Sequence, residues 1–230
     1  MFENMNEQQA REEILKQVAA YCDKYHNTKK EFKEGDRIPY ASRVYDSEGD
    51  GKSCGTAHWK FWLTAGRYTD EFEREFSKYL GVRFCSLVNS GSSANLIAFM
   101  ALTSPLLRER QVKRGDEVIT VAAGFPTTVT PVIQYGAVPV FVDVTIPQYN
   151  IDVTKLEEAY SEKTKAVMIA HTLGNPFDLT AVKDFCDKHN LWLVEDNCDA
   201  LGSKYNYKGE EKFTGTVGDI GTSSFIRHTT

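Results

Sequence analysis

The sequence has few of the features that mark membrane proteins, disulfide-stabilised domains or local metal sites. Its five cysteines are odd in number and widely spaced, and no two form a C-x-x-C pair, so neither a disulfide framework nor a local zinc or iron–sulfur site is indicated. The N-terminus is polar, and no apolar run is long enough to span a bilayer. These absences predict a cytoplasmic protein without a membrane partner.

An excess of positive charge is also missing. The 230 residues carry a formal net charge of -5, and the basic residues are interspersed with acidic ones, which gives no electrostatic reason to expect nucleic acid. The hydrophobic content of 41% is that of an ordinary globular protein and allows a sizeable core in one domain, or two. A small-molecule partner is therefore favoured.

From residue 82 onward, short apolar runs alternate with segments of helical periodicity. The predicted strands are residues 84–88, 117–121, 138–143, 166–170 and 191–195, and the predicted helices between them are residues 92–103, 127–135, 154–160 and 179–189. This alternation predicts an α/β fold with a mostly parallel sheet that helices cover on both faces. Residues 1–66 are predicted to form a separate N-terminal helix, over residues 8–25, and an aromatic-rich arm, while residues 67–230 form the large domain.

The most informative stretch begins at Leu191, where an apolar strand ends in Glu195, Asp196 and Asp199. In a parallel α/β sheet, ligands bind outside the carboxyl ends of the strands, so Asp196 is expected to face a ligand. A carboxylate in that place suits the ring nitrogen of a pyridoxal-type cofactor, which must stay protonated. The alternative is that Asp196 caps a loop or binds a ribose.

Other predicted strand ends carry groups that complement such a cofactor. The segment from Asn89 to Asn95 offers hydroxyls and free amides at a helix N-terminus, which favours a phosphate, although a Ser-capped turn fits equally well. Phe125 could stack on a flat ring or be an ordinary loop aromatic. His171 or Asn175 could reach the same crevice or simply form a turn. A further short strand, residues 218–225, brings more hydroxyls to this edge.

With these motifs together, the sequence resembles the DegT/DnrJ/EryC1/StrS family of sugar aminotransferase-like enzymes, and within it the 3-dehydrase branch that serves lipopolysaccharide synthesis. The segments that carry the resemblance are residues 38–40, 89–94, 123–128, 171–176, 194–202 and 218–225. Asp199 points to the dehydrase branch, because the aminotransferases usually have His or Gln there. The role of Asp199 itself stays open.

The resemblance implies the large domain of an aspartate-aminotransferase-like fold that binds pyridoxal or pyridoxamine 5'-phosphate. Ser92 and Ser93 would hold the cofactor phosphate, and Ser224 would add a phosphate contact. Phe125 would stack on the ring, and Asp196 would pair with the ring nitrogen.

The resemblance also implies an activity: pyridoxamine-phosphate-dependent dehydration at C3 of a CDP-4-keto-6-deoxyhexose, for the dideoxysugars of O-antigen. The full-length family would further imply a homodimer, a [2Fe-2S] cluster bound by cysteines in the later half of the chain, and a flavin/iron–sulfur reductase as partner. A pyridoxal-phosphate-dependent nucleotide-sugar aminotransferase and a non-catalytic remnant remain alternatives.

The likeness stops after Phe225. The catalytic His, the cluster cysteines and the C-terminal small domain of the family have no counterpart, and the catalytic role is not transferred to His228. Loss of one base after the Phe225 codon would turn the family's Tyr-Pro-Ala-His-His into residues 226–230. We therefore expect a truncated, inactive form that arose by a frameshift, with its catalytic residues unknown.

Overall fold

A computed structural model of the chain describes residues 2, 4–25, 33, 35–36 and 65–225. These residues fall into two units, one within Met1–Glu71 and the other Phe72–Phe225. The arm predicted between residues 35 and 66 lies almost entirely outside the described residues. The boundary predicted at residue 67 therefore stays a prediction.

The first unit contains the predicted N-terminal helix, α1 (Glu7–Tyr25). Asn6 and Gln9 form a reciprocal cap at its start, because the Gln9 amide donates to the Asn6 side chain at 2.9 Å and the Asn6 amide donates to the Gln9 side chain at 3.0 Å. This arrangement satisfies amides that have no partner within the helix. The sequence-based helix is thus confirmed, with its start one residue earlier.

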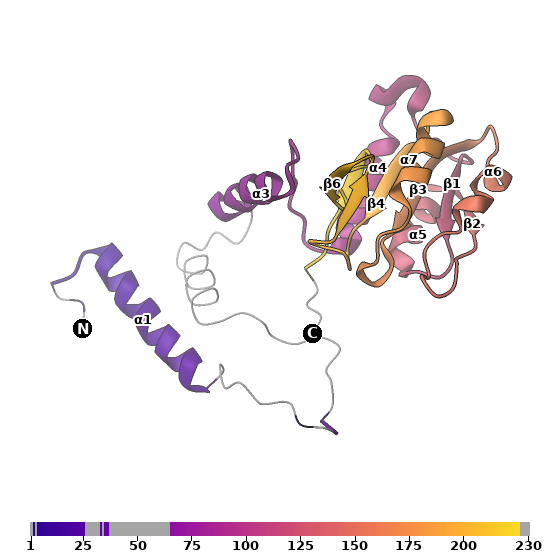
Figure 1. The fold of residues 1–230 in the computed structure, drawn as a ribbon. Coiled ribbons are helices and arrows are strands. Elements are labelled where there is room, and N and C mark those ends of the chain that lie inside the picture. The colour runs from indigo at the N-terminus through magenta and orange to yellow at the C-terminus, as the bar shows by residue number, and fades with distance from the viewer. Residues whose placement is uncertain (1, 3, 26–32, 34, 37–64, 226–230) are drawn as a thin grey trace. The chain divides into compact units, whose positions relative to one another are not determined.

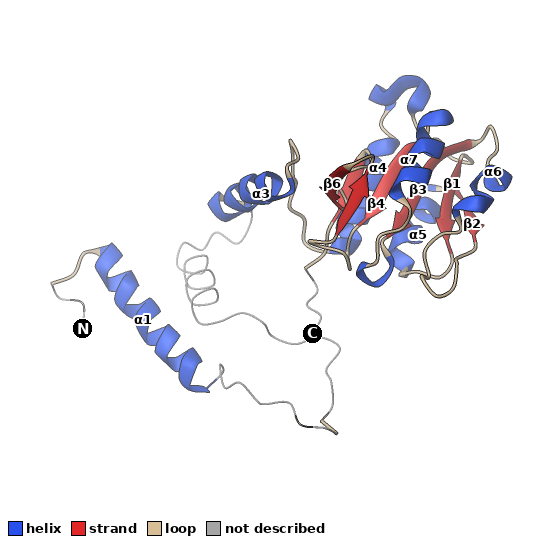
Figure 2. Ribbon diagram, viewed as in Figure 1, coloured by secondary structure: helices blue, strands red, loops and turns tan. Residues whose placement is uncertain are grey.

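The second unit is built on a parallel sheet with the strand order β2-β1-β3-β4-β7 (Figures 1 and 2). The strands are β1 (Glu117–Val121), β2 (Val138–Val142), β3 (Thr164–Ala170), β4 (Trp192–Asp196) and β7 (Ile220–Thr222). Every pair of neighbours is parallel. The predicted sheet is confirmed, and the carboxyl ends of its strands share one edge.

Helices connect the strands and cover both faces of this sheet. These α-helices are α4 (Gly91–Leu102), α5 (Pro126–Tyr135), α6 (Leu156–Ala159) and α7 (Leu179–Lys188). A further helix, α3 (Arg67–Leu80), precedes them and runs across the boundary between the units. Three 3₁₀ turns accompany them, η1 (Pro105–Arg110), η2 (Val153–Lys155) and η3 (Thr172–Gly174). Within the part of the chain that the structure describes, no helix is both long and apolar enough to cross a bilayer.

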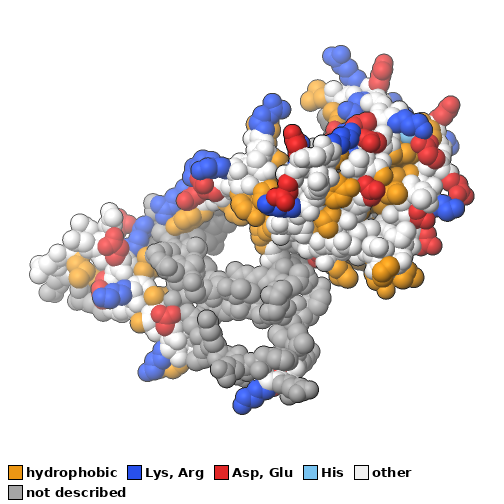
Figure 3. Space-filling view, in the orientation of Figure 1, with side chains coloured by type: hydrophobic (Ala, Val, Ile, Leu, Met, Phe, Trp, Pro, Cys, Tyr) orange, Lys and Arg blue, Asp and Glu red, His pale blue; other side chains and the backbone are white. Residues whose placement is uncertain are grey.

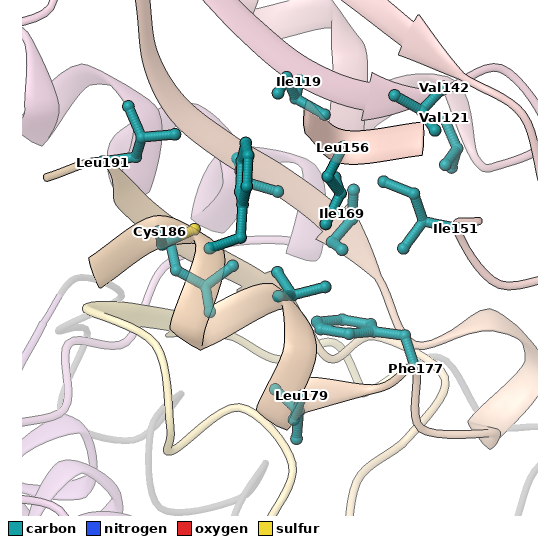
Figure 4. Close-up of a cluster of buried hydrophobic side chains, with 14 residues drawn as sticks. Ile119, Val121, Val142, Ile151, Leu156, Ile169, Phe177, Leu179, Cys186 and Leu191 are labelled. Atoms are coloured by element: carbon teal, nitrogen blue, oxygen red, sulfur yellow. The ribbon is translucent and has the colours of Figure 1, made fainter. Parts of the chain in front are cut away.

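Two hydrophobic clusters, one on each face, hold the sheet between its helices. Figure 4 shows the cluster that joins α6 and α7 to the sheet, with Ile169 of β3 and Leu179 of α7 among its side chains. The other cluster joins α4 and α5 to the sheet through Phe99, Val132 and Met168. Because side chains alternate along a strand, β3 sends Ile169 to the first cluster and Met168 to the second.

The surface of the described residues is mixed in charge. On the face drawn in Figure 3, Lys and Arg side chains lie among Asp and Glu side chains rather than in a patch of one sign. Such a surface matches the interspersed charges of the sequence.

Two parts of the second unit differ from the sequence-based prediction. Residues 84–88 do not form a strand, because no described strand pairs with this apolar run. Phe84 within it is largely exposed. The antiparallel hairpin of β5 (Lys204–Tyr207) and β6 (Glu210–Phe213) was not predicted. A short apolar run does not by itself show whether it pairs as a strand. For the hairpin, a signal was available in the sequence, because polar and aromatic residues alternate from Lys204 to Tyr207 just before the turn residue Gly209.

The packing of β3 leads to a stability prediction. Ile169→Ala should lower the free energy of unfolding by about 2–5 kcal/mol, because it leaves a cavity among the buried side chains of the first cluster. Ile133→Ala makes the same change at an exposed position on α5 and should cost no more than about 0.5 kcal/mol. Urea unfolding followed by circular dichroism measures both, and equal losses would contradict the assigned burial.

Candidate functional site

The carboxyl ends of β1, β4 and β7 bring polar side chains together with the start of α4. The loop after β1 leads to Phe125 and Thr128, β4 ends with Asp196, and β7 ends with Thr222. Asp196 and Thr222 are neighbours in the β4–β7 register. The predicted edge therefore holds several of the residues singled out in the sequence.

Asp196 lies at the centre of this edge, only 2% exposed. Its Oδ2 accepts hydrogen bonds from Asn95 Nδ2 and from Thr128 Oγ1, both at 2.7 Å. Its Oδ1 accepts one from the Cys198 amide at 3.2 Å. Burying a carboxylate without such donors would be strongly destabilising, so the three hydrogen bonds are what allow Asp196 to lie inside the protein.

Cys198 follows Asp196 but has the properties of an unreactive thiol. Burial raises the pKa of its thiol, the charge and hydrogen bond of Asp196 raise it further, and the result is about 12. The thiolate form is the one that attacks substrates or binds metals, so Cys198 is not a nucleophile at neutral pH.

The start of α4 carries the predicted phosphate-binding serines. Ser90 caps the helix, since its Oγ accepts from the Ser93 amide at 3.2 Å. Ser92 is exposed and Ser93 is half-buried in the same turn. Ser224 lies against this turn, because a Cβ on Gly91 would lie 2.6 Å from Ser224 Cβ. All three predicted serines are thus close to one helix N-terminus, where an anion is favoured.

Phe125 directly precedes α5 and is 57% exposed. Thr128, which binds Asp196, follows it after two residues, so the aromatic ring belongs to the same end of α5 as the buried carboxylate. An exposed phenyl ring in that position is available to stack on a flat ligand.

Glu195 and His171 form a second buried group. Their side chains are fully buried, with His171 Nε2 and Glu195 Oε2 at 2.9 Å, and the His171 ring stacks on Phe177. The remaining acceptor sites of Glu195 bind the amides of the loop before β7, at residues 215, 217 and 218. Strand alternation explains why Glu195 and its neighbour Asp196 have different partners.

The hypothesis that His171 or Asn175 reaches the ligand crevice is therefore not supported. His171 is committed to Glu195, and Asn175 Nδ2 donates to the Gln148 carbonyl at 3.5 Å. The turn interpretation of this loop is the better one.

Sequence reasoning missed Asn95 and Thr128, the side-chain partners of Asp196, and Thr222, which binds Asn95. Thr222 donates to Asn95 Oδ1 at 2.6 Å and so joins the group indirectly. A signal for Asn95 was present, because it is a lone amide at the start of the apolar run from Leu96 to Leu102. A buried polar side chain in such a helix needs a partner, but the sequence does not say which one.

The fold and the site define a class of protein, the α/β fold of the pyridoxal-phosphate-dependent aminotransferases. The structure aligns with that of GDP-4-keto-6-deoxy-D-mannose-3-dehydratase from E. coli with bound hydrated PLP, with a TM-score of 0.71 and 34% identity over 79% of this chain and 45% of that one. It also aligns with the PLP form of a sugar aminotransferase, described as putative, from Streptococcus pneumoniae, with a TM-score of 0.73 and 25% identity over 83% of this chain and 49% of that one.

Residues 50–229 match the DegT/DnrJ/EryC1/StrS aminotransferase family, and the chain belongs to it. It is 51% identical over 215 residues to the lipopolysaccharide biosynthesis protein RfbH of Salmonella typhimurium, covering 94% of this chain and 48% of that protein. It is 52% identical over 163 residues to a dTDP-4-dehydro-2,6-dideoxy-D-glucose 3-dehydratase of Saccharopolyspora spinosa, covering 71% and 34% respectively. The chain thus spans about half or less of the length of these relatives.

The Glu195 group predicts a dependence of stability on pH. Burial raises the pKa of Glu195, but the hydrogen bonds from His171 and the Gly218 amide outweigh burial and leave that pKa below its ordinary value. Its stabilising effect is therefore complete above about pH 4.3 and is lost as the pH falls through the lower folded-state pKa. Glu195→Gln should lower the free energy of unfolding at pH 7 by about 1–3 kcal/mol. Below about pH 4.3, the free energy of unfolding of this variant should fall less with decreasing pH than that of the parent chain.

Glu158→Gln is the matched control, because Glu158 is an exposed carboxylate whose ion pair with Lys155, at 3.3 Å, is open to solvent. Urea titrations at several pH values compare the two variants with the parent chain. A Glu195→Gln variant with the parent's pH dependence would refute the assigned role.

Proposed function

We propose that this chain is the cofactor-binding portion of a pyridoxamine-phosphate-dependent nucleotide-sugar 3-dehydratase. The observation that carries the proposal is the buried Asp196 carboxylate beside a Ser-rich helix N-terminus, on the sheet edge where such folds bind their ligands. Ser92, Ser93 and Ser224 bind the phosphate, Phe125 stacks on the ring, and Asp196 holds a proton on the ring nitrogen.

The residues present fit this cofactor. At the start of α4, the Ser93 amide donates to Ser90 Oγ. The amides of Gly91 and Ser92 have no described side-chain acceptor, so they are available to bind an anion. Oδ1 of Asp196 keeps acceptor capacity, because a carboxylate oxygen has room for about two hydrogen bonds. When bound, pyridoxamine phosphate would supply an amine that condenses with the sugar ketone, with loss of water, and a protonated ring that takes up the electron pair left by a removed C–H proton until that pair expels the C3 hydroxyl.

The relatives support dehydration rather than amination as the activity. Identity to the S. spinosa 3-dehydratase is 52%, against 34% to the GDP-perosamine synthase of Vibrio cholerae. The substrate we propose is a CDP-4-keto-6-deoxyhexose, as the family resemblance implies. The 51% identity to RfbH, a lipopolysaccharide biosynthesis protein, supports the place of this chain in lipopolysaccharide synthesis. A pyridoxal-phosphate-dependent sugar aminotransferase is the second candidate, since the structure also aligns with such enzymes.

The other features that the family resemblance implies belong to the whole protein. A homodimer and a flavin/iron–sulfur reductase remain proposals for it. Among the described residues, no group of three or more His, Cys, Asp or Glu side chains could hold a metal ion. The described part of the chain therefore shows no ligand set for a [2Fe-2S] cluster, and no step is assigned to one.

The proposal is tested by cofactor binding to the purified chain. Asp196→Asn keeps the shape of the side chain but removes the charge that would hold the ring proton, so the Kd for pyridoxamine phosphate should rise about tenfold or more. Asp199→Asn makes the same change three residues later and should have a smaller effect. Equilibrium dialysis measures both, and equal affinities for the two variants would count against the pairing of Asp196 with the ring.

A further inference from the structure

Four buried polar side chains meet at the end of the sheet, and the proposed function uses only one of them. Asn95 of α4, Thr128 of α5, Asp196 of β4 and Thr222 of β7 are each no more than 5% exposed. They come from four different elements, so the fold has to bring them together. Buried polar groups impose a strict geometry because each must be satisfied within the protein.

The hydrogen bonds of this group have one consistent direction. Thr222 Oγ1 donates to Asn95 Oδ1 at 2.6 Å, and Asn95 Nδ2 donates to Asp196 Oδ2 at 2.7 Å. Turning the Asn95 amide over would place its oxygen against the carboxylate of Asp196, so only this orientation satisfies both neighbours. The amide is therefore locked between the hydroxyl and the carboxylate.

The two oxygens of Asp196 consequently differ. Oδ2 accepts from both Asn95 and Thr128, each at 2.7 Å, and its capacity is used. Oδ1 accepts the Cys198 amide, at the longer distance of 3.2 Å. The hydrogen bonds of the protein thus fill Oδ2 and leave acceptor capacity on Oδ1.

We propose that Thr222, Asn95 and Thr128 are positioning residues, which commit Oδ2 of Asp196 to the protein and leave Oδ1 to bind the protonated nitrogen of a heteroaromatic ring. This inference rests on the proposed function and names the residues that aim its central carboxylate. A carboxylate held from two sides cannot rotate, so the ring proton always meets the same oxygen.

The same group couples the ring end of the site to the phosphate end. Thr222 pairs with Asp196 in the sheet, and its carbonyl accepts the Asn197 amide at 2.8 Å. Ser224, next to the start of α4, follows only two residues later. Thr222 on β7 therefore links the position of Asp196, the proposed partner of the ring nitrogen, to that of Ser224, a proposed phosphate-binding residue.

The test compares Thr128→Val, which keeps the shape of the side chain without the hydroxyl, with Thr128→Ser, which keeps the hydroxyl. The full chain is titrated with pyridoxamine phosphate and, separately, with inorganic phosphate. Thr128→Val should raise the Kd for pyridoxamine phosphate about tenfold, while Thr128→Ser should stay within about twofold of the wild type. The affinity for inorganic phosphate should be the same in all three proteins.

A spectroscopic readout separates positioning from a merely structural effect. In Thr128→Val, the absorption spectrum of the bound ring should change to its unprotonated form at a lower pH than in the wild type, because the carboxylate no longer faces the ring proton in one fixed orientation. Thr222→Val with Thr222→Ser repeats the comparison at the far end of the group. It also provides the test if Thr128→Val does not fold.

The outcomes are distinct. Wild-type affinity and spectrum in both valine variants, with weak binding by Asp196→Asn, would overturn the inference and leave the proposed function standing. Equal weakening of pyridoxamine phosphate and inorganic phosphate by Thr128→Val would also overturn it, since that result indicates general damage. Failure of the folded wild-type chain to bind pyridoxamine phosphate would overturn the proposed function and this inference with it.

Discussion

The second unit depends on how strand β4 buries two carboxylates in succession. Glu195 and Asp196 are both almost completely inaccessible, and each would be strongly destabilising without hydrogen-bond donors. Because successive side chains of a strand point to opposite faces, the donors must come from two different sets of elements. The loop after β3 and the loop before β7 supply one set, and the helices α4 and α5 supply the other.

The two carboxylates differ in how completely they are satisfied. Glu195 accepts one imidazole and three amide hydrogen bonds over both its oxygens, so it has no capacity left and serves to anchor the chain. Asp196 has its donors concentrated on one oxygen. A saturated acid stabilises the fold, whereas an acid with an open acceptor can bind a ligand. This difference is the physical reason for assigning a structural role to Glu195 and for proposing a ligand-binding role for Asp196.

The sequence predicted the parts of the fold that have a strong local pattern. Strand β1 and the core of β4 followed from apolar runs, and helix α4 followed from its Ser-rich start and apolar continuation. The same logic failed for residues 84–88, where an apolar run has no described partner strand, since pairing is a property of the whole sheet. It also missed β5 and β6, which pair with each other rather than with the main sheet.

The candidate site was predictable to a similar depth. The positions of Asp196 at a strand end and of Ser92 and Ser93 at a helix start were predicted because both are local features. The side-chain partners of Asp196 were not found, because Asn95 and Thr128 are 101 and 68 residues away from it in the sequence and meet it only through the tertiary fold. For His171, the sequence left a crevice residue and a turn residue equally open. Its position after β3 was correct, but its partner, Glu195, could not be read from a single strand.

The loop before β7 explains how the two acids depend on each other. Glu195 holds this loop through the amides of residues 215, 217 and 218, and the loop delivers β7 to the edge of β4. The approach is close enough that a Cβ on Gly221 would lie 1.9 Å from the Gly215 carbonyl oxygen, so only glycine fits there. Thr222 is the next residue and orients Asn95 against Asp196. Glu195 on one face of β4 is thus connected, through a single loop and strand, to the hydrogen bonds that hold Asp196 on the other face.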